Sequence, residues 1–357
     1  PANAGYRSKG ENCLLKTGSV AYKSSLPVAS NELPLKAGEC VKIGPVNIRG
    51  IPTNRLMIVL RTNGCEYARK TGGCSVCGFM KNAGENIGDT QIAGQFRYVL
   101  QTLDGHDIQE IDLLTLGSFL NDREVGPAAR KALLGQAADL EKIRRITIES
   151  RAEYVSVEKL KECRQWSGDK ILELGIGLES ADDYIRNTII RKNLSKDDFE
   201  QSVADVKSAG CDLMAYVLVK PPGLSEKEAI RDAVDTAIYV FDTARKYQVN
   251  ARVAFEPVFI CQNTDLETLF DNKEYRLANL WSVVEVVKRT HHLGSVFIGL
   301  SDESLSLDRM VYSCDKCYER VVNEIELFNK TQDFSDLALA DCDCKAAYQY
   351  LVREEMI

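Results

Sequence analysis

The sequence has no hydrophobic run that approaches the ~20 residues needed for a membrane-spanning helix, which excludes an ordinary helical membrane protein. Its first ten residues also lack the apolar core of a secretory signal, so we expect a protein that is not exported. Its 45% hydrophobic and 27% charged residues are ordinary for a globular protein. Twelve cysteines without an export signal favour a reducing compartment, where thiols bind metals rather than form disulfides. We therefore expect a cytoplasmic protein with no membrane attachment.

The sequence also has fewer basic than acidic residues. The 357-residue chain carries 45 Lys and Arg residues against 52 Asp and Glu residues, a formal net charge of −7. A protein that holds nucleic acid unaided usually has a basic surplus, because contacts to phosphates supply most of the affinity. If the substrate is RNA, we therefore expect a partner protein to do much of the holding.

Cysteine, by contrast, is concentrated in one place: Cys65, Cys74 and Cys77 lie within thirteen residues. They follow the short apolar run 56–61, which is typical of a buried strand, and α/β folds place their chemistry on the loops that leave such strands. Glycines in the same loop let the backbone wrap closely around a bulky inorganic centre. Thiolates favour iron–sulfur clusters, zinc or copper(I). Three of them leave one iron of a cubane cluster open to a substrate or cofactor.

Other interpretations of this loop fit less well. A structural zinc site needs four closed ligands, and the nearest candidates, Cys40 and His106, lie far away in the sequence. A disulfide framework does not suit an odd number of cysteines. Inert core thiols would lie among apolar residues, whereas this loop is rich in glycine and charge. An open iron–sulfur cluster is therefore the first expectation, and zinc is the second.

From residue 56 onward, β-rich runs alternate with stretches that have the spacing of amphipathic helices, which predicts an α/β fold with a parallel sheet. The strands are expected at 56–61, 111–116, 145–149, 171–177, 211–219, 251–259 and 295–300. The helices are expected at 91–102, 127–138, 157–165, 196–208, 225–247 and 280–290. Residues 1–50 lack periodicity and are expected to form an irregular N-terminal extension, followed by a barrel over 51–300 and a tail module over 301–357.

The tail contains two further cysteine pairs. Cys314 and Cys317 form a CxxC motif, and Cys342 and Cys344 form a CxC motif. Four thiolates in two tight pairs satisfy the ligand count of a structural zinc site, with a helical stretch at 321–329 between them. A second iron–sulfur cluster is the alternative, since four thiolates suit that centre too.

The spacing Cx8Cx2C, on a glycine-rich loop after a strand, resembles the radical S-adenosylmethionine (radical SAM) superfamily, in the branch that holds the elongator catalytic subunit. Within it, the chain is most similar to the archaeosine-biosynthesis radical SAM proteins, which act on a modified base of transfer RNA. The similar stretches are 61–65, 72–79, 116–120, 148–151, 174–179, 219–226 and 280–285. The resemblance implies a partial (β/α)6 barrel, a [4Fe–4S] cluster on Cys65, Cys74 and Cys77, and S-adenosylmethionine (SAM) as cofactor.

The resemblance also implies roles for residues at the ends of the expected strands. Gly117 and Ser118 are expected to meet the ammonium group of SAM, and Arg151 suits its carboxylate because a guanidinium pairs with both carboxylate oxygens. The other expected cofactor contacts are Glu149, Glu179 and Phe79, and the expected substrate contacts are Tyr216 and Lys220. The alternative for each is an ordinary residue at the end of a strand.

The function implied by the resemblance is radical cleavage of a C–N bond in a lysine adduct of a 7-deazaguanine in transfer RNA, which forms the amidine of archaeosine. Such a lyase would need an electron donor such as ferredoxin or flavodoxin. One alternative is a radical SAM enzyme that acts on a small molecule or peptide, which suits the acidic charge. A further alternative is a non-enzymatic iron–sulfur or zinc scaffold.

Overall fold

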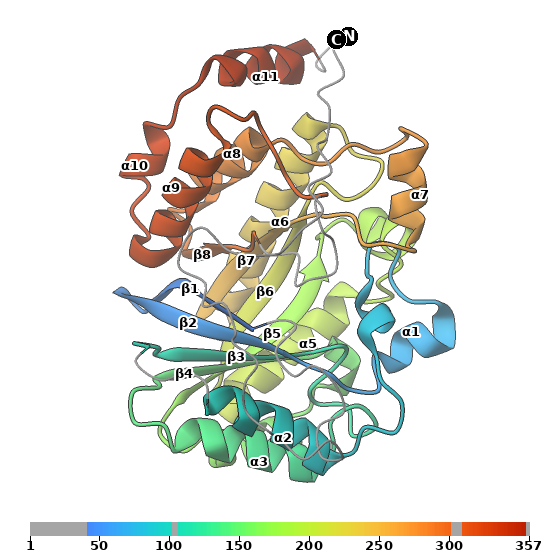
Figure 1. The fold of residues 1–357 in the computed structure, drawn as a ribbon, viewed down its shortest axis with the longest axis vertical. Helices are drawn as coiled ribbons and strands as arrows, with labels where there is room; N and C mark the ends of the chain where they lie inside the picture. Colours follow the sequence, from blue (N-terminus) through green and yellow to red (C-terminus); the bar gives the residue numbers. More distant parts are fainter. Residues whose placement is uncertain (1–40, 102–105, 301–308, 355–357) are drawn as a thin grey trace.

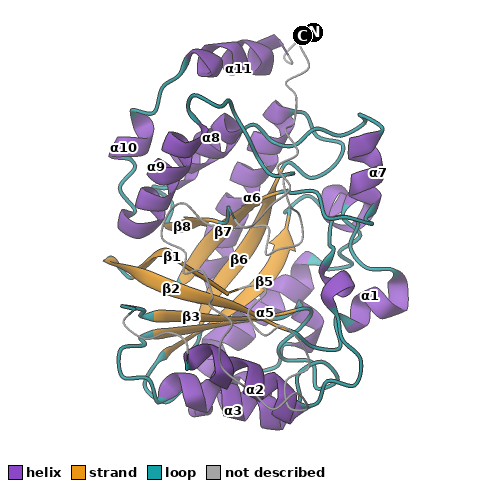
Figure 2. Ribbon diagram, in the orientation of Figure 1, coloured by secondary structure: helices purple, strands orange, loops and turns teal. Residues whose placement is uncertain are grey.

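The computed structural model describes residues 41–101, 106–300 and 309–354. In these ranges one eight-stranded sheet curves into a partial barrel, with its strands in sequence order (Figures 1 and 2). Strands β2 to β8 pair in parallel, and β1 pairs antiparallel with β2. The strands are β1 (Val41–Ile48), β2 (Ile51–Leu60), β3 (Glu110–Thr115), β4 (Arg145–Glu149), β5 (Ile171–Glu179), β6 (Asp212–Val219), β7 (Ala251–Pro257) and β8 (Ser295–Ile298).

Helices follow the strands and cover the outer face of the sheet (Figure 2). The α-helices are α1 (Glu66–Thr71), α2 (Asp89–Leu100), α3 (Pro127–Ala138), α4 (Val157–Trp166), α5 (Lys196–Ala209), α6 (Glu226–Tyr247), α7 (Asp265–Asp271), α8 (Leu280–Thr290), α9 (Tyr318–Thr331), α10 (Ser335–Ala338) and α11 (Asp343–Glu354). The shorter turns are η1 (Phe79–Asn82), η2 (Ala152–Tyr154) and the π-helical turn η3 (Ile185–Ile189). Within the described ranges, each helix is too short or too polar to cross a bilayer.

The predicted alternation of strand and helix is confirmed, and six βα units from β2 to β7 form the partial barrel. The helix starts have local causes. Ser225 accepts a hydrogen bond from the backbone N–H of Glu228, and the Glu228 carboxylate accepts one from the Ser225 N–H, so α6 begins with a capping box. Ser156 caps α4 by accepting from the N–H of Lys159.

The expectation of an irregular segment before the barrel is wrong for residues 41–48, which form β1. This strand pairs with β2 from Val41 opposite Ile58 to Ile48 opposite Ile51. Gly44 and Pro45 lie in its middle, and both residue types disfavour a strand, which hid it from the sequence pattern. Residues 1–40 lie outside the described part of the chain.

Helix α9 lies between the two edge strands, β1 and β8. The side-chain amide of Asn329 exchanges two hydrogen bonds of 2.9 Å with the backbone of Ile298 in β8. Gln332, at the end of α9, does the same with Val296, at 3.0 and 2.8 Å. On the other side, the Asn47 amide of β1 donates to a carbonyl in the last turn of α9 at 2.9 Å. Two helix side chains therefore cover the backbone of an edge strand that would otherwise be open to another chain.

The amino-terminal end of the barrel interior is filled by buried ions. Glu110 accepts hydrogen bonds from Arg145 and Arg252, each at 2.8 Å, and Arg252 also donates to Glu173 at 2.9 Å. Burial raises the pKa of Glu110, but the two guanidinium groups outweigh that effect and hold it at about 2. These buried ions therefore serve stability, because barrel enzymes place their chemistry at the carboxyl ends of the strands.

Candidate active site

A cavity of about 230 Å³ opens at the carboxyl ends of β2 to β7. It brings together residues from the loops and strand ends of six consecutive βα units. The predicted site residues that line it are Cys65, Cys74, Cys77, Phe79, Gly117, Glu149, Arg151, Glu179 and Tyr216. Lys192, Glu256 and Cys261 line it as well and were not predicted. Chain segments almost 200 residues apart in the sequence thus face one space.

Hydrogen bonds to the segment that follows β5 help to hold the loop that carries the three cysteines. The N–H of Ser75 donates to the carbonyl of Ile190 at 2.9 Å, and its hydroxyl donates to the carbonyl of Ile189 at 2.8 Å. The Tyr67 hydroxyl donates to the carbonyl of Arg191 at 2.6 Å. The cysteine loop and the π-helical turn η3 therefore position each other across the mouth of the barrel.

Two glycines allow the backbone to come close to this loop. A Cβ atom at Gly117 would lie 2.9 Å from the Cα of Cys65, and one at Gly78 would lie 2.6 Å from the Cβ of Cys261. Real Cβ atoms do not approach so closely, so only glycine fits at both positions. Three soft thiols on one wall, with the neighbouring backbone stripped of side chains, fit a bulky iron–sulfur centre.

Glu124 links the cysteine loop to the turn after β3. Its buried carboxylate accepts from the N–H of Glu66 at 2.8 Å and from the N–H of Ser118 at 2.5 Å. A Cβ at Gly117 would lie 1.8 Å from its Oε2. This residue was missed by sequence reasoning, because an acidic residue in a loop gives no sign that it binds two backbone amides.

Arg151 lies with its guanidinium at the edge of the cavity. Its Nε donates to Glu153 at 2.5 Å, its Nη2 donates to the carbonyl of Lys192 at 2.7 Å, and its plane stacks 3.8 Å from the ring centre of Tyr67. Nη1 has no partner among the described residues, so one end of the fork remains available for an anionic group.

The end of β5 carries a strained acidic residue. Glu179 has a φ of 67°, and the register between β5 and β6 shifts between Gly177 and Glu179. Its carboxylate forms an ion pair with Lys192 at 2.6 Å, and a Cβ at Gly177 would lie 2.4 Å from the Lys192 Nζ. Positive φ at a residue other than glycine is costly and clusters at functional sites. Here the bulge and the glycine make room for the ion pair on the cavity wall.

Glu149 and Tyr216 form a second polar pair in the cavity, in which the tyrosine hydroxyl donates to the carboxylate. Burial raises the pKa of Glu149 to about 7, although the hydrogen bond from Tyr216 acts to lower it. Glu256, at the end of β7, has its pKa raised to about 8, chiefly by burial. Both groups can therefore change protonation near neutral pH.

Two predicted residues lie outside the lining of the cavity. Ser118 is fully buried, and its hydroxyl accepts from the N–H of Arg151 at 3.2 Å. Lys220 is buried too, and its ammonium group binds Glu226 at 2.5 Å and the carbonyl of Leu277 at 3.4 Å. Their assigned contacts with cofactor and substrate stay predictions, and the ion pair of Lys220 favours a structural role.

The four tail cysteines come together as predicted. Their Sγ atoms all lie within 4.8 Å of one another, with Cys314 at 3.5 Å from Cys317 and 3.7 Å from Cys342, and Cys317 at 3.5 Å from Cys344. Cys317 precedes α9 and Cys344 lies in the first turn of α11. Such a set of thiols can hold a metal ion.

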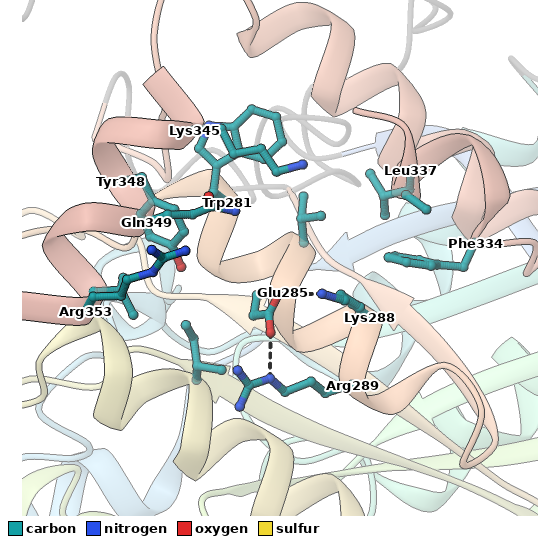
Figure 3. Close-up of a pocket in the computed structure, with 14 residues that line it drawn as sticks. Trp281, Glu285, Lys288, Arg289, Phe334, Leu337, Lys345, Tyr348, Gln349 and Arg353 are labelled. Atoms are coloured by element: carbon teal, nitrogen blue, oxygen red, sulfur yellow. Dashed lines mark hydrogen bonds and ion pairs between the residues drawn. The ribbon is translucent and has the colours of Figure 1, made fainter. Parts of the chain in front are cut away.

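A second cavity, of about 450 Å³, lies between α8 and α11, away from the active-site lining (Figure 3). Aromatic and apolar side chains form part of its wall, namely Trp281, Phe334, Leu337 and Tyr348. Its charged residues are Lys288, Arg289, Lys345, Arg353 and the single carboxylate of Glu285. Glu285 pairs with Arg289 at 2.7 Å and with Lys288 at 3.6 Å, so the cavity keeps a positive excess.

A partial barrel with three cysteines on the loop that follows its first parallel strand has the arrangement of the radical SAM class of enzymes. Sequence relatives narrow this class to a family. Archaeosine synthase subunit beta of Thermococcus kodakarensis is 30% identical over 319 residues, which cover 87% of this chain and 95% of that protein. The subunit of the same name from Methanosarcina acetivorans is 28% identical over 313 residues, 86% of this chain and 88% of that protein. The chain belongs to the archaeosine synthase subunit beta family of radical SAM enzymes.

One further relative and two solved structures are similar to the chain but do not narrow its function. An uncharacterized protein of Methanocaldococcus jannaschii is 30% identical over 309 residues, 84% of this chain and 82% of that protein. Among solved structures, Methanocaldococcus infernus Elp3 with an N-terminal deletion has a TM-score of 0.49 at 17% identity, covering 67% of this chain and 59% of that chain. Methylornithine synthase has a TM-score of 0.49 at 14% identity, covering 72% and 70%. With TM-scores below 0.5, these two solved structures support no conclusion about this chain. No family model matches the chain.

Proposed function

We propose that the chain is a lyase that modifies transfer RNA, cleaving the C–N bond in a lysine adduct of a 7-deazaguanine to leave the amidine of archaeosine. The observation that carries the proposal is the cavity itself, which combines three thiols with an acidic wall in a chain whose relatives are named archaeosine synthase subunit beta. The acidic wall suits a substrate that carries a positively charged amidine.

Cys65, Cys74 and Cys77 would hold a [4Fe–4S] cluster, and SAM bound beside it supplies the 5′-deoxyadenosyl radical that removes a hydrogen atom from the substrate. The protein orients the reactants and excludes water. Arg151 offers its free Nη1 to the cofactor carboxylate, and Gly117 permits close approach of the backbone. Apolar residues complete the wall and keep water out, namely Val76, Leu116, Ile190, Leu218 and Phe259.

For the tail we propose a structural zinc ion. Tetrahedral zinc with Zn–S bonds of ~2.3 Å places its sulfur ligands about 3.8 Å apart. The Sγ separations of 3.5–3.7 Å between Cys314 and its two neighbours suit that geometry. A cubane cluster gives each thiolate an iron of its own and so requires wider spacing, which favours a single ion.

The proposed partners are transfer RNA, a second subunit and an electron donor such as ferredoxin or flavodoxin. The relatives are named as one subunit of a synthase, which supports a second subunit. The net charge of −7 supports RNA binding that is shared with this partner. The positive excess of the cavity between α8 and α11 offers one local contact for phosphates.

The net charge also favours a second candidate, a radical SAM enzyme whose substrate is a small molecule or peptide. One experiment separates the two. The chain is reconstituted anaerobically with iron and sulfide, reduced with SAM, and incubated with or without transfer RNA that carries the lysine adduct. We expect 5′-deoxyadenosine and archaeosine to form together, and only with the adduct RNA. Formation of 5′-deoxyadenosine without archaeosine would overturn the RNA substrate, and its complete absence would overturn the enzyme.

A further inference from the structure

The active-site cavity contains three carboxylates, and two of them have partners. Glu149 accepts from the Tyr216 hydroxyl, and Glu179 pairs with Lys192 at 2.6 Å. The third, Glu256, forms no hydrogen bond or ion pair with any residue in the described ranges. A carboxylate that is held in a cavity without a protein partner is available to a ligand.

The backbone fixes the position of Glu256. It is the last residue but one of β7, so it lies at the carboxyl end of the barrel with the other rim residues. Its carboxylate rests against Gly299, where a Cβ atom would lie 2.0 Å from Oε2 and 2.2 Å from Oε1. The N–H of Gly299 is bonded to the carbonyl of Phe255 in β7 at 2.9 Å. The carboxylate therefore occupies space that the absence of a side chain at Gly299 creates.

Charges of both signs surround Glu256. Burial raises its pKa to about 8, Arg55 and Lys42 act to lower it, and Glu149 and Glu179 act to raise it. Arg55 already forms an ion pair with Asp112 at 2.6 Å. A cation bound between these carboxylates would offset their repulsion and favour the ionised form of Glu256.

We propose that Glu256 binds a cationic nitrogen of the substrate, which under the proposed function is the amidinium group of the lysine adduct. This inference rests on the proposed function because it takes the substrate to be the lysine adduct. Cleavage breaks the bond between a carbon of the adduct and a nitrogen that stays in the amidine, so the cation and the reacting carbon must lie in the same cavity. A carboxylate pairs with both N–H groups of an amidinium, as it does with a guanidinium. Glu256 is the carboxylate of this cavity that is free to do so.

Binding of two nucleosides to the unreduced, SAM-loaded chain tests this role without turnover. One is a 7-deazaguanosine that bears an N-alkylamidine, and the other is the matched N-alkylamide, which is neutral but has nearly the same shape. We expect the wild type to bind the amidine about 10- to 100-fold more tightly, the range for a hydrogen bond to a charged group. Glu256→Gln should abolish this preference, and Glu256→Asp should keep part of it. Glu141→Gln, an exposed residue before β4, is the matched control and should behave like the wild type.

The possible results separate a failure of this inference from a failure of the proposed function. Equal binding of both nucleosides by the wild type, or an unchanged preference in Glu256→Gln, overturns the inference. A loss of SAM affinity in Glu256→Gln that equals the loss for the amidine also overturns it, because the carboxylate would then serve the cofactor. A wild type that prefers the amidine but forms no archaeosine on adduct RNA contradicts the proposed function and leaves the role of Glu256 standing.

Discussion

The indole Nε1 of Trp281 donates a hydrogen bond to the Sγ of Cys344 at 3.2 Å. Trp281 is a buried residue of α8, and Cys344 is one of the four tail thiols. The ammonium group of Lys345 lies 4.9 Å from the centre of the indole ring. The tail module is therefore joined to a helix of the barrel at a metal-binding sulfur.

This contact makes Trp281 a reporter of the tail metal. The chain has two tryptophans, so in Trp166→Phe the emission comes from Trp281 alone. We expect a chelator to shift this emission to longer wavelength, because loss of the metal frees Cys344 and lets water reach the indole. Zinc should restore the spectrum. Unchanged emission after metal analysis has confirmed complete removal would contradict this arrangement.

Replacement of a cysteine in the first loop should abolish cluster binding. After anaerobic reconstitution, we expect Cys77→Ala to lose nearly all of the iron that is not held by the tail, and to form no 5′-deoxyadenosine. Cys163→Ala is the control, since that thiol is buried in α4 outside the cavity. Iron and sulfide analysis measures the result, and full iron content in Cys77→Ala would rule out the assigned ligands.

Gly117→Ala should destabilise the site because its Cβ would overlap the Glu124 carboxylate, at 1.8 Å, and the Cα of Cys65, at 2.9 Å. Overpacking of this kind costs about 1–3 kcal/mol. Gly135→Ala in α3 is the matched control: no atom lies within 4 Å of its Cβ, and helix propensity predicts a gain of about 0.5–1 kcal/mol. Thermal unfolding compares them. Equal midpoints for the two variants would show that the close approach is not needed.

Stability should fall as the pH rises through neutrality. Glu149, with a pKa of about 7, and Glu256, with a pKa of about 8, keep protons that the unfolded chain loses near pH 4.5. The folded state thus binds more protons between about pH 4.5 and 8, and the free energy of unfolding decreases across that window. In the double variant Glu149→Gln, Glu256→Gln we expect a shallower slope in thermal unfolding at several pH values. An unchanged slope would argue that both groups titrate normally.

Arg151→Lys should weaken the binding of SAM about tenfold, because a lysine can neither stack on Tyr67 nor keep its bonds to Glu153 while it reaches an anion. Equilibrium binding to the reconstituted, unreduced chain measures the effect. Lys161→Arg, on the exposed face of α4, is the control for a general change of cation type. Wild-type affinity in Arg151→Lys would place the cofactor carboxylate elsewhere.

The sequence predicted the barrel well because each of its elements shows its own local pattern of apolar residues. Strand β1 was the exception, since Gly44 and Pro45 interrupt that pattern and the strand is stabilised by tertiary contacts with β2 and α9. Among site residues, those within short motifs, such as Arg151, were found in the cavity.

The residues that sequence reasoning missed lie outside such motifs. Glu256 was placed inside the expected strand 251–259, yet the structure ends β7 at Pro257, which puts its carboxylate on the rim. Cys261 was not predicted as a site residue, because nothing in the sequence shows its approach to Gly78. Lys220 was expected to face the substrate, but its neutralisation by Glu226 depends on the path of the loop before α6. Such contacts are set by tertiary structure.

Helix α9 begins directly after Cys317 and ends at the two amides that cover β8. Helix α9, which connects the two edge strands of the barrel, therefore begins directly after Cys317, one of the proposed metal ligands. Removal of the metal from the tail would loosen this attachment and let β1 move away from β8, although β1 lies far from the four cysteines in the sequence. Under the proposed function, the radical chemistry in the cavity would then depend on the supply of a different metal to the tail, so that a cell short of that metal would lose the enzyme activity as well as the tail structure.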